Sequence, residues 1–353
     1  MEQQPINVLV TGGAGFLGRA LLAELLREEG VLPVREVRVL DLQAASLAGV
    51  DPRLVPLSGD VRDYPTVLRA CEGVDVVIHS AALVDWGRLP EEELEAVNVG
   101  GTDNVIRACV EASVPALVHT STLDVVYRGR PITDGDESLP YAERHVNAYC
   151  RTKAEAERRV LAANNDGALR TVVLRPCGIF GERDPYHVTS LIEMARRMPL
   201  FRIGDGKSRS QHVYVGNVAH AHLLAARTLL RPGSPAAGQV YFVTDFPAKN
   251  FFDYLEPILN GAGYRMLPWA LSVPRGVMYG LAVTLEGAAQ LLRPVVRFTP
   301  TVTRFAVDYV CLELTFRSDK AARELGYRPI YSEEQAFART IAYFKERDAT
   351  SCG

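Results

Sequence analysis

Residues 8–26 read VLVTGGAGFLGRALLAELL, and this stretch decides the fold that the sequence predicts. An apolar run typical of a buried strand leads into closely spaced glycines, and a run with apolar residues at helical spacing follows. Glycines at this position allow a tight turn and let a pyrophosphate approach the amides at the helix start. The strand, loop and helix follow in the order that a dinucleotide-binding unit requires. The cofactor contacts predicted here are Gly12, Gly15, Phe16, Leu17 and Gly18.

The alternation of apolar runs and helical patterns continues through the first half of the chain. Further apolar runs lie at 36–41, 54–60, 74–82, 115–122 and 170–176. Amphipathic helical patterns lie at 18–30 and 101–113. Strands that are apolar on both faces need cover on both sides. We therefore predict an α/β fold with a doubly wound parallel sheet of the Rossmann type.

After about residue 180 the alternation ends, and this change predicts a smaller, mostly helical C-terminal lobe. Helices of that lobe are predicted at 251–263 and 270–292. The run at 239–245 predicts one more strand of the sheet. We expect residues 1–180 to form the dinucleotide-binding domain, with elements near 213–245 returning to it. Residues 181–353 should mainly form a substrate-binding lobe.

The composition excludes several classes of protein. A net charge of -3 over 353 residues gives no field that would attract nucleic acid. Six scattered cysteines without a C-x-x-C pair, and no signal peptide pattern before Ile6, predict reduced thiols, no metal site and a cytoplasmic protein. The apolar stretch 271–298 has its longest uncharged run between Arg275 and Glu286, which is too short to span a bilayer. Shallow contact with a membrane surface remains open.

Acidic residues end the second and third predicted strands. Asp41 lies where a carboxylate accepts hydrogen bonds from both hydroxyls of an adenosine ribose and repels a 2′-phosphate. No Arg or Lys occurs in the following stretch 42–49, so the sequence favours NAD over NADP. Asp60, with Val61 beside it, is placed to meet the adenine edge. A strand-end cap is the alternative role for Asp41, and a turn is the alternative for Asp60.

Tyr149 and Lys153 share one face of a predicted helix because they are four residues apart. Lys153 is the first lysine of a chain that has 34 arginines and 5 lysines, and no other Tyr-x-x-x-Lys occurs. A nearby ammonium and the positive nicotinamide ring of an oxidised cofactor would lower the phenol pKa from its usual value near 10. A guanidinium is bulkier and would not offer a ribose the same donor geometry. The pair predicts a tyrosine base tuned by lysine, with a chance contact on a surface helix as the alternative.

A cluster of hydroxyl groups ends the strand at 115–122. The carboxyl ends of parallel strands face the ligand crevice, so we expect these hydroxyls to lie there. Thr122 is the preferred hydrogen-bond donor to a substrate oxygen, and Ser121 is a close second. Capping of a neighbouring helix is the alternative role.

With these motifs in this order, the chain resembles the extended short-chain dehydrogenase/reductase superfamily. It is similar in particular to the 3β-hydroxysteroid dehydrogenase group, including the sterol-4α-carboxylate 3-dehydrogenases. The resemblance covers nearly the whole chain, and the narrower likeness rests on residues 139–157, on LRPCGIFGERDP and on the amphipathic region near 270–300. The motifs are TGGAGFLG, GDVRD, HSAALVD, VNVGGTDNVI, HTST, DESLPYAERHVNAYCRTKAEAE, LRPCGIFGERDP, HVYVGNVAHAHLLAA and ELGYRP.

The resemblance implies roles for individual residues. Thr122, Tyr149 and Lys153 would form the catalytic group, and Asn98 would hold the lysine through its backbone and a water. The residues expected to wall the cofactor are Ala81, Ala82, Pro176 and Ile179. Many steroid enzymes carry serine where this chain has Thr122. The 271–298 stretch is also less hydrophobic than in membrane-bound relatives, which argues against membrane attachment.

The predicted reaction is a reversible oxidation in which the Tyr149 phenolate takes the proton of a secondary alcohol and hydride passes to NAD. The apolar second lobe favours a bulky substrate such as a 3β-hydroxysteroid or sterol, and we expect a homodimer. A nucleotide-sugar epimerase or dehydratase is the first alternative, because Arg202, Lys207 and Arg209 offer a clamp for a diphosphate. A reductase of long-chain 3-oxo acids is a second. A non-catalytic dinucleotide sensor is the alternative of another class, and the tyrosine–lysine pair argues against it.

Overall fold

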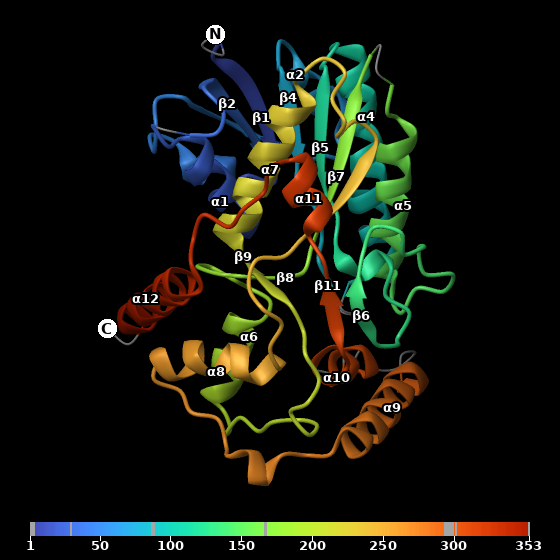
Figure 1. The fold of residues 1–353 in the computed structure, drawn as a ribbon, viewed down its shortest axis with the longest axis vertical. Helices are drawn as coiled ribbons and strands as arrows, with labels where there is room; N and C mark the ends of the chain where they lie inside the picture. Colours follow the sequence, from blue (N-terminus) through green and yellow to red (C-terminus); the bar gives the residue numbers. More distant parts are fainter. Residues whose placement is uncertain are drawn as a thin grey trace.

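Seven strands form one parallel sheet in the computed structural model, which describes residues 4–28, 30–85, 89–165, 168–292, 300 and 302–351. The strand order across the sheet is β10 (Gln239–Val243), β7 (Arg170–Pro176), β5 (Ala116–Thr120), β4 (Val76–His79), β1 (Ile6–Thr11), β2 (Val34–Asp41) and β3 (Leu54–Ser58). The chain winds outward from β1 in both directions (Figure 1). The predicted doubly wound fold is therefore confirmed, and the run at 239–245 supplies the strand β10.

Helices cover both faces of this sheet (Figure 1). Val8 and Val10 of β1 pack into one core with α1 (Phe16–Leu25) and α7 (Val215–Leu229). Leu9, between them, points to the opposite face and packs with α2 (Tyr64–Cys71) and α4 (Gly101–Glu111). The alternation follows from the two-residue period of a strand. It explains why the central strands are apolar throughout. A further helix, α5 (Ala148–Ala162), lies on the α4 side.

The second half of the chain builds a lobe below the carboxyl ends of the strands (Figure 1). Its helices are α6 (Val188–Ala195), α8 (Phe251–Gly261), α9 (Arg275–Leu292), α10 (Arg304–Cys311) and α12 (Glu333–Ser351). Helix α11 (Asp319–Glu324) instead packs beside β10 of the sheet. Two small parallel pairs join the lobe to the sheet: β8 (Gly178–Phe180) with β9 (His212–Tyr214), and β6 (Ile132–Gly135) with β11 (Leu314–Phe316). The remaining short elements are α3 (Glu91–Leu94), a π-helix η2 (Glu95–Gly100) and the 3₁₀ turns η1 (Ala44–Leu47), η3 (Leu123–Val125) and η4 (Trp269–Leu271).

Helix α9 occupies the apolar stretch for which membrane contact remained open. Met278 and Ala282 are its buried residues, and they pack against α10. Several apolar side chains of α9 are exposed, namely Val277, Leu281, Val283, Leu291 and Leu292. Residues 293–298 of the stretch lie outside the described part of the chain. Among the described residues, no helix has the length and apolar character needed to span a bilayer.

Candidate active site

The glycine loop between β1 and α1 is closed tightly against its surroundings. Gly12 has a φ of +73°, and a Cβ at this residue would lie 2.8 Å from the backbone of Ala81. A Cβ at Gly18 would collide with the carbonyl oxygen of Gly12, so α1 approaches the loop only because this residue is glycine. Helix α1 begins at Phe16, two residues earlier than predicted, because the loop leads directly into its first turn. The loop thus directs backbone amides at a helix start into the space above the sheet.

Asp41 fixes the loop to the end of β2. One of its carboxylate oxygens accepts a hydrogen bond from the Ala14 amide (3.1 Å), and the other accepts one from the Gln43 amide (2.8 Å). Each oxygen keeps a free lone pair for another donor. At the end of β3, Asp60 forms an ion pair with Arg62 at 2.6 Å, and this hydrogen-bonded guanidinium lowers the pKa of the Asp60 carboxyl.

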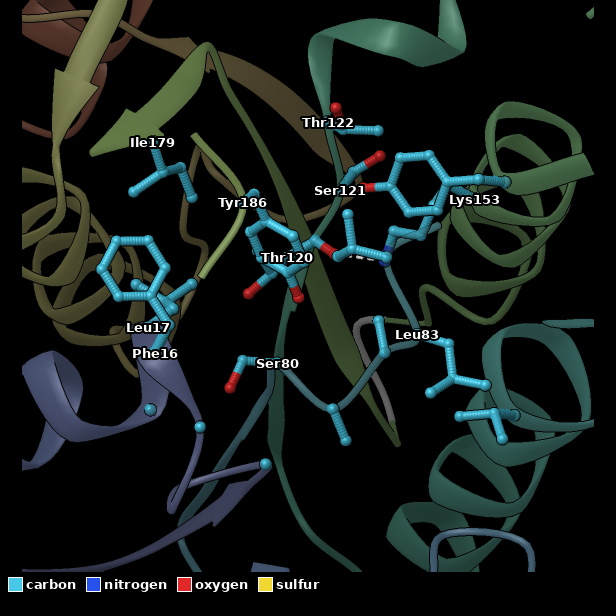
Figure 2. A pocket seen from close by; sticks show the side chains of 18 of the residues that line it. Phe16, Leu17, Ser80, Leu83, Thr120, Ser121, Thr122, Lys153, Ile179 and Tyr186 are labelled. Carbon is cyan, nitrogen blue, oxygen red and sulfur yellow. Dashed lines mark hydrogen bonds between the residues drawn. The ribbon is translucent and has the colours of Figure 1, made fainter. Parts of the chain in front are cut away.

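A single cavity of about 380 Å³ runs from this loop to the start of α5 (Figure 2). All but one of the sequence-predicted site residues line it. They are Gly12, Gly15, Phe16, Leu17, Gly18, Asp41, Asp60, Val61, Ala81, Ala82, Thr122, Tyr149, Lys153, Pro176 and Ile179. In Figure 2, Phe16 and Leu17 lie on one side of the space, and Thr120 to Thr122 and Lys153 lie on the other. The structure thus brings residues from six strand ends to one cavity, as the carboxyl edge of a doubly wound sheet does.

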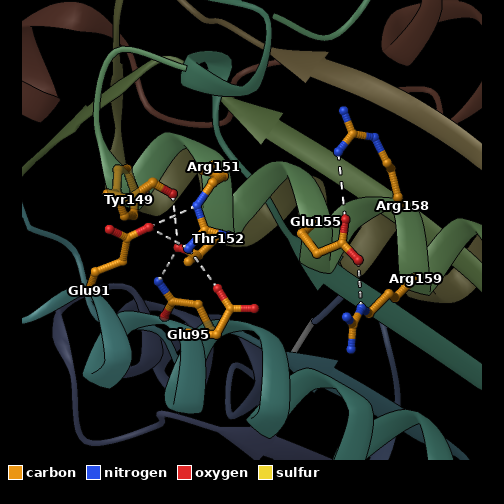
Figure 3. Close-up of polar contacts among 9 residues, drawn as sticks. Glu91, Glu95, Tyr149, Arg151, Thr152, Glu155, Arg158 and Arg159 are labelled. Atoms are coloured by element: carbon orange, nitrogen blue, oxygen red, sulfur yellow. Dashed lines mark hydrogen bonds and ion pairs between the residues drawn. The ribbon is translucent and has the colours of Figure 1, made fainter. Parts of the chain in front are cut away.

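Helix α5 places Tyr149 and Lys153 on its buried face. The Asn147 side chain caps the helix by accepting from the Cys150 amide at 2.8 Å, so the helical turn starts just before Tyr149. On the outer face, Arg151 pairs with Glu91 (2.9 Å) and Glu95 (2.8 Å) of the neighbouring α3–η2 segment (Figure 3). The helix is therefore anchored on both sides at the turn that carries the two predicted catalytic residues.

The Lys153 ammonium is buried at the carboxyl end of β5. It donates a hydrogen bond to the Thr120 carbonyl oxygen at 2.7 Å, as Figure 2 shows. Burial lowers its pKa from 10.5 to about 8, although the Glu157 carboxylate one turn further along α5 opposes this shift. At neutral pH the group is thus still mainly an ammonium, and two of its three N–H donors remain for a ligand.

The pKa of Tyr149 moves in the direction opposite to the one expected from the sequence. Burial raises it well above 10, the Asp124 carboxylate adds to the rise, and a hydrogen bond with Thr122 opposes it. Desolvation disfavours the phenolate, and the negative charge of Asp124 disfavours it further. Groups of the chain itself therefore keep Tyr149 protonated at neutral pH. The sequence predicted that Lys153 lowers the Tyr149 pKa, but the groups of the chain raise it.

The structure separates the two hydroxyls between which the sequence left a choice. The Ser121 hydroxyl donates to the Glu157 carboxylate, which also binds Arg175 at 2.5 Å and Tyr141 at 2.8 Å. The Thr122 hydroxyl instead donates to the Asp124 carboxylate at 2.9 Å, and it lowers the pKa of the Tyr149 phenol. Thr122 is thus the hydroxyl that influences the tyrosine, whereas Ser121 is bound to a buried ion pair.

That ion pair leads to a prediction on stability. The Glu157 and Arg175 side chains are 0% and 4% exposed, so Glu157→Gln leaves a buried guanidinium without its counter-charge. We expect a loss of about 3–5 kcal/mol in the free energy of unfolding, measured in denaturant. Glu155→Gln, on the same helix but 35% exposed in its pair with Arg159, is the matched control and should cost less than about 1 kcal/mol. Equal losses in the two variants would contradict this role.

Asn98 is the predicted catalytic residue that does not line the cavity. Its side chain accepts from the Leu83 amide (2.8 Å) and donates to the Leu83 carbonyl (3.0 Å) and to the Thr152 hydroxyl (3.2 Å). It thereby ties the π-helix η2 to a cavity-lining segment and to α5. Its hold on Lys153 through its backbone and a water stays a prediction.

Several lining residues were not predicted from the sequence. Tyr186 and His187 come from the loop after β8, and Tyr309 comes from α10. The rings of Tyr309 and His187 stack, with their centroids 5.8 Å apart. These three aromatic groups are the contribution of the second half of the chain to the lining. Asp124 lies two residues after Thr122 and also lines the cavity. Its place next to the hydroxyl cluster is the one signal that could have identified it.

Comparisons with known proteins agree with this geometry. Residues 9–273 match the model of the 3-beta hydroxysteroid dehydrogenase/isomerase family. The chain is 36% identical to 3beta-hydroxysteroid-dehydrogenase/decarboxylase isoform 1 of Arabidopsis thaliana, over 97% of this chain and 80% of that protein. It is 38% identical to 3 beta-hydroxysteroid dehydrogenase type 7 of Mus musculus, over 97% and 96% of the two chains.

A solved structure shares the fold over the whole length. DesIV, a dTDP-glucose 4,6-dehydratase from Streptomyces venezuelae determined with NAD and TYD bound, superposes with a TM-score of 0.74 at 25% identity. The match covers 98% of each chain. The sequence matches, however, run to hydroxysteroid dehydrogenases over nearly the full chain. The chain belongs to the 3-beta hydroxysteroid dehydrogenase/isomerase family and is an oxidoreductase of the extended short-chain dehydrogenase/reductase superfamily.

Proposed function

We propose that the chain binds NAD and catalyses the reversible oxidation of a secondary alcohol on a bulky apolar substrate, of the 3β-hydroxysteroid or sterol class. The observation that carries the proposal is one cavity that holds the glycine loop and Asp41 at one end and Thr122, Tyr149 and Lys153 at the other. Mere binding of a dinucleotide does not require the second group. The cavity supports catalysis over a sensor role for this reason.

The residues at the loop end of the cavity fit NAD. A Cβ at Gly12 would fill the space against Ala81, so this cradle exists only with glycine. Asp41 offers carboxylate lone pairs at the end of β2, where the hydroxyls of an adenosine ribose would be held. No lining residue of this end other than Arg62 is basic among the described residues, and Arg62 is paired with Asp60. A 2′-phosphate would therefore meet the Asp41 charge without a free cation.

Each side chain of the site has its own role in the proposed reaction. The nicotinamide, when bound, supplies the acceptor for the hydride. Lys153 holds its ammonium on the Thr120 carbonyl and directs its remaining donors toward the cavity, where they can fix a ribose. Tyr149 would take the proton of the substrate alcohol as a phenolate, the form that the Thr122 hydroxyl favours because it lowers the pKa of this phenol. Tyr186, His187 and Tyr309 add aromatic surface to the lining.

The rival nucleotide-sugar substrates lack support in the cavity. Arg202 is buried in a pair with Glu256 (2.6 Å), Lys207 is on the surface beside Asp205, and Arg209 pairs with Glu313 (2.7 Å). None of these three cations lines the cavity. These three cations therefore cannot bind a diphosphate in the cavity, whereas the aromatic side chains of its lining suit an apolar ring system. The names of the sequence relatives support the same substrate class.

The proposal is tested by offering the purified protein NAD with a panel of hydroxysteroids, sterols, 3-hydroxy acids and nucleotide sugars, and following NADH formation. We expect turnover of 3β-hydroxysteroids or sterols and none of nucleotide sugars. Turnover confined to nucleotide sugars or to 3-hydroxy acids would replace the substrate class. NAD binding without turnover of any alcohol would favour the sensor.

Asp41→Asn tests the cofactor end separately. The variant keeps the shape of the side chain but replaces a charged acceptor of ribose hydrogen bonds with a neutral one, a change of about 1.5–3 kcal/mol. We expect NAD to bind about 10- to 100-fold more weakly in a calorimetric titration, with a smaller gap between NAD and NADP. Asp51→Asn is the control, because Asp51 pairs with Arg53 at 3.0 Å and does not line the cavity. Tighter binding of NADP than of NAD by the unchanged protein would contradict the role of Asp41.

A further inference from the structure

Tyr309 of α10 lines the cavity beside a glycine of the expected cofactor wall. A Cβ at Gly178 would lie 2.5 Å from the Tyr309 hydroxyl oxygen and 2.9 Å from Cδ2 of His212. Real Cβ atoms do not approach their neighbours so closely, so the phenol occupies this place only because residue 178 is glycine. In the sequence, Gly178 lies between Pro176 and Ile179, which are expected to wall the cofactor, and all three line the cavity. A helix of the second lobe thus places its hydroxyl next to that wall.

Neighbouring rings hold the Tyr309 side chain in this position. Its ring stacks on that of His187, from the loop after β8, with the centroids 5.8 Å and the planes 15° apart. The ring of Phe251, from α8, meets it edge to face at 6.0 Å, and the ring of Phe305 in α10 lies at 5.9 Å. A side chain packed on several sides has few alternative rotamers. The position of the hydroxyl is therefore set by the chain before a substrate binds.

The Tyr309 hydroxyl is available to a ligand. The residue is half-buried and lines the cavity, and no hydrogen bond joins its hydroxyl to another of the described residues. Burial raises the pKa of the phenol well above 10, so the group is a neutral hydroxyl that can both donate and accept. A substrate that fills the cavity takes this hydroxyl out of water, and a buried polar group without a partner is costly. A substrate with an oxygen at this place avoids that cost.

We propose that Tyr309 is a specificity-determining residue, whose hydroxyl binds an oxygen of the substrate other than the reacting alcohol. The preferred substrate is then a 3β-hydroxysteroid or sterol that carries a second hydroxyl or keto group. The inference rests on the proposed function and narrows its substrate class. The reacting alcohol is assigned to Tyr149, so two polar contacts would fix the orientation of a ring system in a largely apolar cavity.

Paired ligands test the Tyr309 hydroxyl. The pairs are 3β-hydroxysteroids that share one ring skeleton and differ by one further hydroxyl, and their Kd values are measured by calorimetry with NADH present. The unchanged protein should prefer the member with the further hydroxyl in at least one pair. Tyr309→Phe keeps the ring, and it should lower that preference about 3- to 10-fold, as expected for one neutral hydrogen bond. Equal binding of both members in every pair, or a preference that Tyr309→Phe leaves intact, overturns the inference.

Kinetic constants and a control variant separate substrate binding from other roles. In NAD-dependent oxidation, Tyr309→Phe should raise KM for the preferred steroid and leave kcat little changed, because the hydroxyl binds substrate and transition state alike. Tyr254→Phe is the matched control, because its ring stacks on His212 in the same aromatic cluster but does not line the cavity. It should keep the preference. If Tyr309→Phe weakens NAD binding as much as steroid binding, the hydroxyl serves the cofactor and the inference is wrong.

Gly178→Ala tests the placement of the hydroxyl. The added methyl group meets Tyr309, so we expect a lower melting temperature and a loss of the preference. Adding Tyr309→Phe removes the closer of the two contacts, so the double variant should recover part of the melting temperature and bind no worse than Tyr309→Phe alone. Gly280→Ala, where a Cβ would meet nothing within 4 Å, is the control and should lower neither quantity. Additive losses of stability in the double variant would contradict this placement.

The two readouts distinguish failure of this inference from failure of the proposed function. If the unchanged protein oxidises 3β-hydroxysteroids but Tyr309→Phe keeps the same preference, the oxidation stands and the role of Tyr309 is wrong. If the steroids bind with the expected preference in the presence of NADH but none is oxidised with NAD, the role of Tyr309 is supported and the proposed reaction fails.

Discussion

Replacing Tyr149 with phenylalanine is expected to lower kcat for alcohol oxidation by about 10³- to 10⁴-fold while NAD binding stays within a few-fold. The variant removes the oxygen to which the proposed function assigns the proton of the substrate alcohol, at a residue that lines the cavity. Losses of this size are typical of a positioned proton-transfer group. The cofactor contacts predicted at the glycine loop and Asp41 are untouched. Steady-state NADH formation and a calorimetric NAD titration on the same preparation give the two numbers.

The control for this variant is Tyr64→Phe. Tyr64 is on α2, donates its hydroxyl hydrogen to the Glu111 carboxylate at the surface and does not line the cavity. It should keep full activity. Both variants should unfold at nearly the same temperature as the unchanged protein, which excludes a folding defect as the reason for lost turnover. Turnover by Tyr149→Phe within tenfold of normal would refute the assignment of this tyrosine.

Hydrophobic pattern explains why the sheet could be predicted from the sequence. A strand such as β1 is apolar at every position because Val8 and Val10 face one layer of helices and Leu9 faces the other. The pairs β6–β11 and β8–β9 could not be predicted in this way, because each strand has only three or four residues. In β6–β11, Ile132 pairs with Leu314, and no local pattern links two residues so far apart in the chain.

In the candidate site, too, local sequence pattern predicts the position of some residues, and tertiary packing alone determines the position of others. Asp41 and the hydroxyl cluster follow strands directly, so the common edge of a parallel sheet places them together. Tyr309 reaches the cavity from α10 through the packing of the second lobe, which the sequence does not specify at the level of one side chain. The direction of the Tyr149 pKa shift was missed for a related reason. Helical spacing places Tyr149 and Lys153 on one face of α5, but it does not reveal the burial and the Asp124 carboxylate that raise the pKa of the phenol.

The pKa values of Asp124 and Lys153, two charged groups that line the cavity, shift in opposite directions. Burial raises the pKa of Asp124 to about 6 and lowers that of Lys153 to about 8. Between these values the carboxylate and the ammonium are both ionised, with the neutral phenol of Tyr149 close to Asp124 and one turn from Lys153. Above this window the loss of the Lys153 ammonium is expected to lower activity.

The second large effect is expected for Lys153→Arg. Lys153 is 3% exposed and flanked by the buried imidazoles His79 and His119, whose pKa values are lowered by burial and by its charge. A guanidinium is larger and planar, so it cannot keep one donor on the Thr120 carbonyl and offer the same two donors to a ribose. We expect kcat/KM to fall about 10²- to 10³-fold, as for a misplaced positioning group.

The pH profile of this variant separates the role of charge from that of shape. In the unchanged protein the ammonium is present below a pH of about 8 and is lost above it, so kcat/KM should fall as the pH rises through that value. A guanidinium does not lose its proton in this range, so the fall near pH 8 should vanish in Lys153→Arg while the overall rate stays low. Lys207→Arg, on a side chain that is 85% exposed, is the matched control and should change neither feature. A variant with normal kcat/KM would show that any cation at position 153 suffices. A fall near pH 8 that persists in Lys153→Arg would assign that limb to another group.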